Sequence, residues 1–160
     1  MADPAPPPLV ISRVFTAPPA RVFAAWSSAD ALRRWFSPAE CCVTAARVDF
    51  RRGGTCEIIM LCPGHPPFQS RGIITELVPP LRLVIRFAVG HGEVAAFIAD
   101  TAVTFEPVAE GTRMTVRQSY EILDPAFAAS IGGAAEGWRT TLDKLAVEVA
   151  PRAAAHDSSP

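Results

Sequence analysis

The stretch RVFAAWSSADALRRWFSP (residues 21–38) contains two of the chain's three tryptophans, and each closes a short apolar segment. Within each segment the apolar residues have the spacing of one helix face: Val22, Phe23 and Trp26 in the first, and Leu32, Trp35 and Phe36 in the second. Ser27 and Ser28 break the pattern and favour a helix N-cap, and Pro38 ends it. The stretch therefore predicts two short helices, each with an aromatic face to bury.

Seven segments rich in β-branched and aromatic residues flank this helical pair and predict strands. One, LVISRVFT (9–16), precedes the helices, and six follow them, at residues 46–52, 55–62, 68–78, 81–89, 96–106 and 112–122. Short connections join these six, and no helical segment lies between them. Such an order is typical of an antiparallel sheet.

The strands alternate charged and apolar residues, as in LRLVIRFAV, where Arg82 and Arg86 oppose Leu83 and Ile85. When one face of a sheet is solvent-exposed and the other is apolar, another element has to pack against the apolar face. The segment 124–149 supplies one, because it begins with Asp-Pro and then keeps near-helical apolar spacing. We therefore predict an α+β fold in which one antiparallel sheet of about seven strands is covered by a long C-terminal helix.

The length of 160 residues predicts a single domain over residues 9–150, with a flexible Pro-rich arm at 1–8 and a flexible tail at 151–160. A net charge of −1 gives no basic field that would attract nucleic acid. No apolar run reaches the ~20 residues of a membrane span, and the first residues do not resemble a signal peptide. We therefore expect a cytoplasmic protein.

The four cysteines, Cys41, Cys42, Cys56 and Cys62, form no CxxC pair. We expect them to be reduced, mostly buried small hydrophobic residues. A metal site built on Cys62 and His65 lacks a second pair of ligands, so we predict no metal and no cofactor.

Five stretches resemble, in the right order, the START/Bet v 1-like (SRPBCC) superfamily, and specifically its branch related to the C-terminal domain of the Hsp90 ATPase activator. They are FTAPPARVFAAWSSADALRRWFSP, VDFRRGG, GIITELVPPLRLVIRF, VTFEPVAEGTRMTV and GWRTTLDKLA. The resemblance implies the helix-grip fold, in which the sheet curls around the long helix and the two short helices close one end. Trp26 and Trp35 would then form an apolar lid or end wall at the wide mouth. The resemblance also implies an apolar ligand between sheet and helix, and it supplies no shared catalytic residue.

Many large residues should point between the sheet and the C-terminal helix, where they either pack as an ordinary core or line a pocket. The candidate lining residues are Trp26, Trp35, Phe36, Phe50, Met60, Ile85, Phe87, Phe97, Thr101, Phe105, Met114, Gln118, Tyr120, Ile131 and Trp138. Gly132, Gly133 and Gly137 favour a pocket, because glycine costs about 1 kcal/mol against alanine inside a helix. Such a cost suggests a need for space, a bend or close backbone approach.

Polar residues among these strands are candidates for orienting a ligand: Thr75, Thr101, Gln118 and Tyr120. Asp100 is a candidate acid or base, although simple alternation turns it outward and only a one-residue slip would turn it inward. Three functions stay open. They are binding of a small hydrophobic or amphipathic molecule, a polyketide cyclase- or aromatase-like enzyme with the same cavity, and a co-chaperone-like or homodimeric interaction protein. The sparse inward polar groups favour binding.

Overall fold

The computed structural model describes residues 6–151 and contains one seven-stranded antiparallel sheet with the strand order β1-β7-β6-β5-β4-β3-β2. Its elements follow in the predicted order: β1 (Leu9–Phe15), α1 (Pro19–Ala24), α2 (Ala29–Trp35), β2 (Cys42–Val48), β3 (Thr55–Leu61), β4 (Phe68–Val78), β5 (Arg82–Gly90), β6 (Phe97–Val108), β7 (Gly111–Ile122), the 3-10 turn η1 (Pro125–Phe127), α3 (Ala128–Gly132) and α4 (Ala134–Val149). The predicted α+β helix-grip fold is confirmed. The arm at 1–8 and the tail at 151–160 lie largely outside the described residues, and their flexibility stays a prediction.

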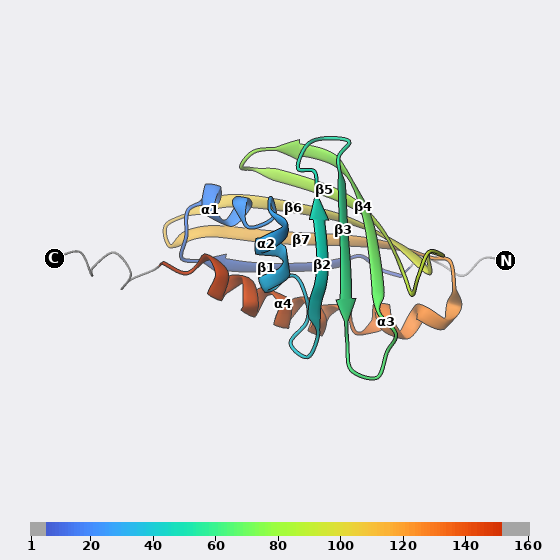
Figure 1. Ribbon diagram of the computed structural model, residues 1–160. Helices are drawn as coiled ribbons and strands as arrows, with labels where there is room; N and C mark the ends of the chain where they lie inside the picture. Colours follow the sequence, from blue (N-terminus) through green and yellow to red (C-terminus); the bar gives the residue numbers. More distant parts are fainter. Residues whose placement is uncertain (1–5, 152–160) are drawn as a thin grey trace.

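The sheet curls over α4, and the short helices lie at the two ends of α4 (Figure 1). Helices α1 and α2 lie beside its C-terminal half, where α2 packs against α4, and α3 lies at its N-terminal end. No helix within residues 6–151 is long and apolar enough to cross a membrane.

The two short helices form as their sequence predicts. Ser28 is the N-cap of α2, and its hydroxyl accepts a hydrogen bond from the Ala31 backbone N–H. Pro19 opens α1, where a missing N–H leaves no helical bond unmade. The two helices thereby turn Trp26 and Trp35 toward each other, with ring centroids 4.8 Å apart.

The predicted strand over residues 46–52 differs most from the structure. Strand β2 runs over Cys42–Val48, so it begins and ends four residues earlier than predicted. A tight turn replaces its end, because Gly53 has a φ of +84° and the Gly54 N–H bonds back to the Arg51 carbonyl. Phe50 therefore lies in the turn, where its ring packs 5.5 Å from that of Phe23.

The C-terminal cover is also interrupted. Segment 124–149 forms η1, α3 and α4 in succession, and the break falls at Gly133, whose φ of −90° and ψ of 2° leave the helical region. The sequence suggested that the glycines provide space, a bend or close backbone approach, and Gly133 provides a bend. A Cβ on Gly137 would make only ordinary contact with Pro38, at 3.6 Å.

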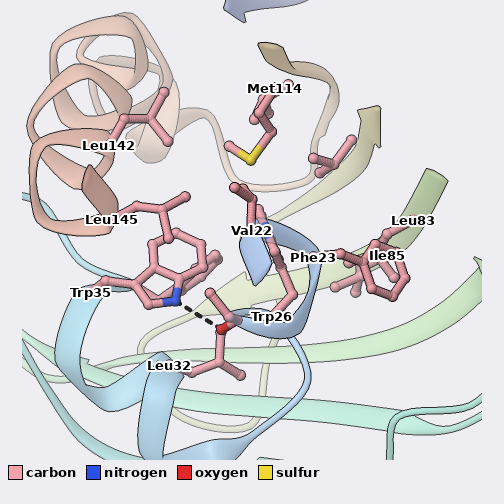
Figure 2. Packing of buried hydrophobic residues seen from close by; sticks show 14 of the residues in the cluster. Val22, Phe23, Trp26, Leu32, Trp35, Leu83, Ile85, Met114, Leu142 and Leu145 are labelled. Carbon is pink, nitrogen blue, oxygen red and sulfur yellow. Dashed lines mark hydrogen bonds between the residues drawn. The ribbon is translucent and has the colours of Figure 1, made fainter. Parts of the chain in front are cut away.

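The core between α4 and the α1–α2 end of the sheet is solid. Figure 2 shows Leu142 and Leu145 of α4 pointing toward Trp35, whose indole N–H donates to the Ala25 carbonyl at 2.9 Å. Met114 of β7 closes the same cluster from the sheet. Each such fully buried apolar side chain contributes about 1.5–3 kcal/mol relative to exposure.

Side chains of β5 pack closely over Gly72 of β4. A Cβ there would lie 2.7 Å from a methyl carbon of Ile85 and 2.8 Å from the ring of Phe87. The absent side chain lets the Phe87 ring lie across β4 rather than project into the interior. Gly72 therefore preserves space on the concave face.

Lys144 fixes the loop between α2 and β2. Its ammonium group donates to the Ser37 hydroxyl at 2.9 Å and to the carbonyls of Pro38 and Cys41 at 2.8 and 3.0 Å. Partial burial lowers the pKa of this ammonium, and the nearby Cys42 and Glu40 act in the opposite direction. One side chain of α4 thus satisfies three acceptors of a loop that has no strand partner.

The expectation of four reduced cysteines is wrong. Cys41 and Cys62 form a disulfide, with their Cα atoms 4.3 Å apart. The α2–β2 loop and the end of β3 bring together two residues that lie 21 positions apart in the sequence, and the spacing alone did not indicate this. Cys42 is exposed, and burial raises the pKa of the Cys56 thiol to about 12, which keeps Cys56 protonated at neutral pH.

Replacing Lys144→Met should lower the free energy of unfolding by about 1–3 kcal/mol, because it leaves the loop acceptors without their charged donor. Chemical denaturation of the two proteins measures this difference. Arg139→Met is the matched control on the same helix. Its exposed side chain pairs only with exposed acids, so we expect a loss below about 1 kcal/mol. Equal losses in the two variants would contradict the role given to Lys144.

Reduction of the disulfide should lower the free energy of unfolding by about 3 kcal/mol, from the chain entropy of a loop of this size. Thermal unfolding with and without dithiothreitol measures the effect. The double variant Cys41→Ser/Cys62→Ser should melt like the reduced protein and ignore the reductant, while Cys42→Ser should melt like the unmodified protein. A melting curve of the unmodified protein that does not respond to dithiothreitol would refute the bridge.

Candidate functional site

A pocket of about 610 Å³ lies between the sheet and the α3–α4 junction. Its position follows from side-chain size. Most of the helical residues that face the sheet here are small, and several of the strand residues in the pocket wall are smaller than the aromatic residues beside them. These small residues are Ala129, Ser130, Gly133, Ala134 and Gly137 on the helices, and Ser70, Val89 and Ala99 on the strands. Further along α4 the inward residues are Leu142, Leu145 and Val149, and there the interior is filled.

Aromatic side chains form much of the pocket wall. Phe36 separates the pocket from the solid core, and its ring lies 5.8 Å from that of Trp138 and 6.0 Å from that of Phe87. Phe68 of β4, Phe97 of β6 and Met60 of β3 also contribute apolar side chains to the lining. The wall is therefore suited to contact with a flat apolar molecule.

A buried hydrogen-bond network lies at the inner end of the pocket and is centred on Gln118 of β7, which is 8% exposed. The Gln118 carbonyl oxygen accepts from the Tyr120 hydroxyl at 2.7 Å and from the Trp138 indole N–H at 3.1 Å. The Gln118 amide nitrogen donates to the Thr101 hydroxyl oxygen at 2.9 Å. Burial raises the pKa of Tyr120 to about 12, so its hydroxyl keeps its proton and remains a donor.

The mouth of the pocket is more polar and lies near the disulfide. Glu40, His65 and Glu136 are exposed lining residues, and both Cys41 and Cys62 contribute to the wall. A hydrogen bond from Arg139 lowers the pKa of Glu136, so this carboxylate is ionised at neutral pH. The bridge thus joins two of the loops that form the opening.

Six of the predicted cavity residues line this pocket: Phe36, Met60, Phe87, Phe97, Gln118 and Trp138. Thr101 and Tyr120 do not line it but lie behind Gln118 as its hydrogen-bond partners. Ile131 packs against the core from α3, and Phe50 lies in the turn after β2.

Five predicted lining residues belong to the solid core instead: Trp26, Trp35, Ile85, Phe105 and Met114. Trp26 and Trp35, at 1% and 0% exposure, form the closed end of the molecule rather than a lid over a mouth. The reason is that the large inward residues of α4 lie opposite them, whereas the small ones lie at the other end. The opening is therefore at the α3 end.

Two polar candidates lie on the outer face of the sheet. The Asp100 side chain is 46% exposed and pairs with Arg86 at 2.6 Å, so the strand does not slip in register there. A bulge in β4 between Ile74 and Glu76 leaves Thr75 exposed. Neither residue reaches the pocket.

The loop residues of the mouth were not predicted: Ser37, Pro38, Glu40, Cys41, Cys62, Pro63 and His65. Alternation assigns faces only within strands, so it gives no orientation for loop side chains. The small residues Ala129, Ser130 and Ala134 carried a usable signal, since they continue the run of small residues around the glycines.

Solved structures similar to this chain share its fold. A putative uncharacterized protein from Rhizobium leguminosarum is 30% identical, with a TM-score of 0.79 over 89% of this chain and 93% of that one. A protein from Nitrosomonas europaea is 25% identical, with a TM-score of 0.76 over 89% of this chain and 93% of the other. The AHSA1 protein from Silicibacter pomeroyi is 22% identical, with a TM-score of 0.71 over 90% and 98% of the two chains, which shows the fold alone. No curated protein matches the chain.

The sequence also matches a family of proteins directly. The match covers residues 16–150, from the end of β1 to the end of α4, and thus includes the core, the pocket and the Gln118 network. The helix-grip fold of this family supports, in general terms, a domain of the ligand-binding type. The chain belongs to the family described as activator of Hsp90 ATPase homolog 1-like protein.

Proposed function

We propose that this protein binds a small hydrophobic or amphipathic molecule in the pocket between the sheet and the α3–α4 junction. The observation that carries the proposal is the combination of a largely apolar wall, a volume of about 610 Å³ and a buried hydrogen-bond network centred on Gln118. Ligand pockets typically have volumes of about 300–1,000 Å³ and a few placed polar groups on an apolar lining.

Small residues maintain the pocket at some expense to stability, which also supports the proposal. Gly137 lies within α4 and is a poor helix former, yet a Cβ there would meet no steric barrier. A sequence shaped by stability alone would be expected to favour alanine there, since the gain is about 1 kcal/mol inside a helix. What these small residues provide instead is the open volume of the pocket.

The enzyme alternative receives less support. An acid or base in the pocket would need to contact the ligand, and the ionisable lining residues Glu40, His65 and Glu136 lie at the exposed mouth. Asp100 lies on the outer face, in an ion pair with Arg86. The co-chaperone-like and homodimeric alternatives, and the cytoplasmic location, stay predictions from the sequence.

Filling the pocket should abolish binding without unfolding the protein. Ala134→Phe places a ring in the pocket from the first turn of α4, and we expect at least a tenfold weaker affinity for the uncharged fluorescent naphthyl ketone prodan. Fluorescence titration measures the affinity, and circular dichroism checks the fold.

Ala135→Phe is the matched control, because Ala135 is exposed on the same turn and does not line the pocket. It should bind the probe like the unmodified protein. If prodan does not bind the unmodified protein, or if both phenylalanine variants bind it equally well, the proposed site is not the ligand site.

A further inference from the structure

We infer that the pocket selects an uncharged, ring-containing ligand that places a hydrogen-bond acceptor, such as a ketone oxygen, against the amide nitrogen of Gln118. The inference rests on the proposed ligand-binding function and names the chemical class of the ligand. The aromatic wall favours the ring, and the rest follows from three features of the site: the orientation of the Gln118 amide, its unused donor, and the charges of the lining.

The neighbours of Gln118 fix the orientation of its amide. An indole N–H can only donate, so the amide atom 3.1 Å from Trp138 must be the carbonyl oxygen. The Tyr120 hydroxyl donates to the same oxygen. Both lone pairs of this oxygen are therefore engaged, and it has no capacity left for a ligand donor.

The amide nitrogen has one hydrogen more than its partners use. It donates one hydrogen to Thr101, whose own hydroxyl lies 3.3 Å from the Ala99 carbonyl and donates to it. Within residues 6–151 no acceptor bonds the second N–H hydrogen. A buried donor without an acceptor is unfavourable, so a ligand that supplies an acceptor here gains affinity over one that does not.

The charges of the lining disfavour an anionic ligand. The acidic side chains that line the pocket are Glu40 and Glu136, and among residues 6–151 no lysine or arginine contributes to the wall. The two cations beside the mouth are engaged, since Arg139 pairs with Glu136 and Lys144 uses its three hydrogens on acceptors of the α2–β2 loop. A carboxylate group on the ligand would thus leave water without a compensating positive charge.

Three naphthalenes of similar size test these features: 2-acetylnaphthalene, 2-ethylnaphthalene and naphthalene-2-carboxylate. Their dissociation constants are measured by calorimetry with the unmodified protein and with Gln118→Leu. The key quantity is the dissociation constant of 2-ethylnaphthalene divided by that of 2-acetylnaphthalene. This ratio removes the contribution of general hydrophobic contact, and it should be threefold to tenfold larger in the unmodified protein than in Gln118→Leu. The carboxylate should bind most weakly.

Two further variants control the result. Gln118→Glu keeps an acceptor for Tyr120 and Trp138 but, when ionised, offers no N–H, so it should lose the ketone preference even if Gln118→Leu is poorly folded. Gln69→Leu makes the same replacement on β4 at a residue that does not line the pocket, and it should keep the preference.

An unchanged ratio in both Gln118 variants, while all three naphthalenes bind, would overturn this inference and leave the proposed function standing. Tighter binding of the carboxylate than of the ketone would overturn it as well. Failure of all three compounds to bind, in a protein that also fails to bind prodan, would instead refute the proposed function and this inference together.

Discussion

The concave apolar face of a single open sheet has to be covered, and in this protein α1 and α2 cover one end of it while α4 runs along the rest (Figure 1). Two small residues that line the pocket, Ala134 and Gly137, lie in the first turn of α4, and the large core residues Leu142 and Leu145 lie further along it. Burial of the large residues holds the helix against the sheet, and this contact fixes how far the small residues stand from the strands. The pocket therefore depends on the same contact that stabilises the fold.

The α2–β2 side of the pocket opening is held by side-chain cross-links rather than by pairing with a strand. The α2–β2 loop contributes Ser37, Pro38 and Cys41 to the opening, and its carbonyls have a charged donor from α4 instead of a neighbouring strand. The disulfide joins this loop to the end of β3. A loop fixed from two directions presents a preformed opening, and preformed sites lose less conformational entropy when a ligand binds.

Periodicity predicted the elements well because each depends on local patterns. Trp26 and Trp35 were correctly expected to bury one face of two short helices, and the alternation of Arg86 with Ile85 gave the faces of β5. The location of the pocket was harder, because a residue that faces inward can either fill space or border it. Whether it fills space or borders a pocket depends on the size of the residues opposite it, and the pattern of one strand does not say which residues of α4 those are. The pairing of Cys41 with Cys62 depends in the same way on two loops that approach each other in space.

Lys144 is the chain's only lysine. Reagents that acylate primary amines therefore have a single side-chain target, and its three hydrogen bonds to the loop should slow its reaction while the loop is closed. Mass spectrometry would detect the reaction as one added group on α4, distinct from any label on the chain's amino terminus. Because the chain has fourteen arginines and one lysine, the rate of this labelling reports how often the loop opens.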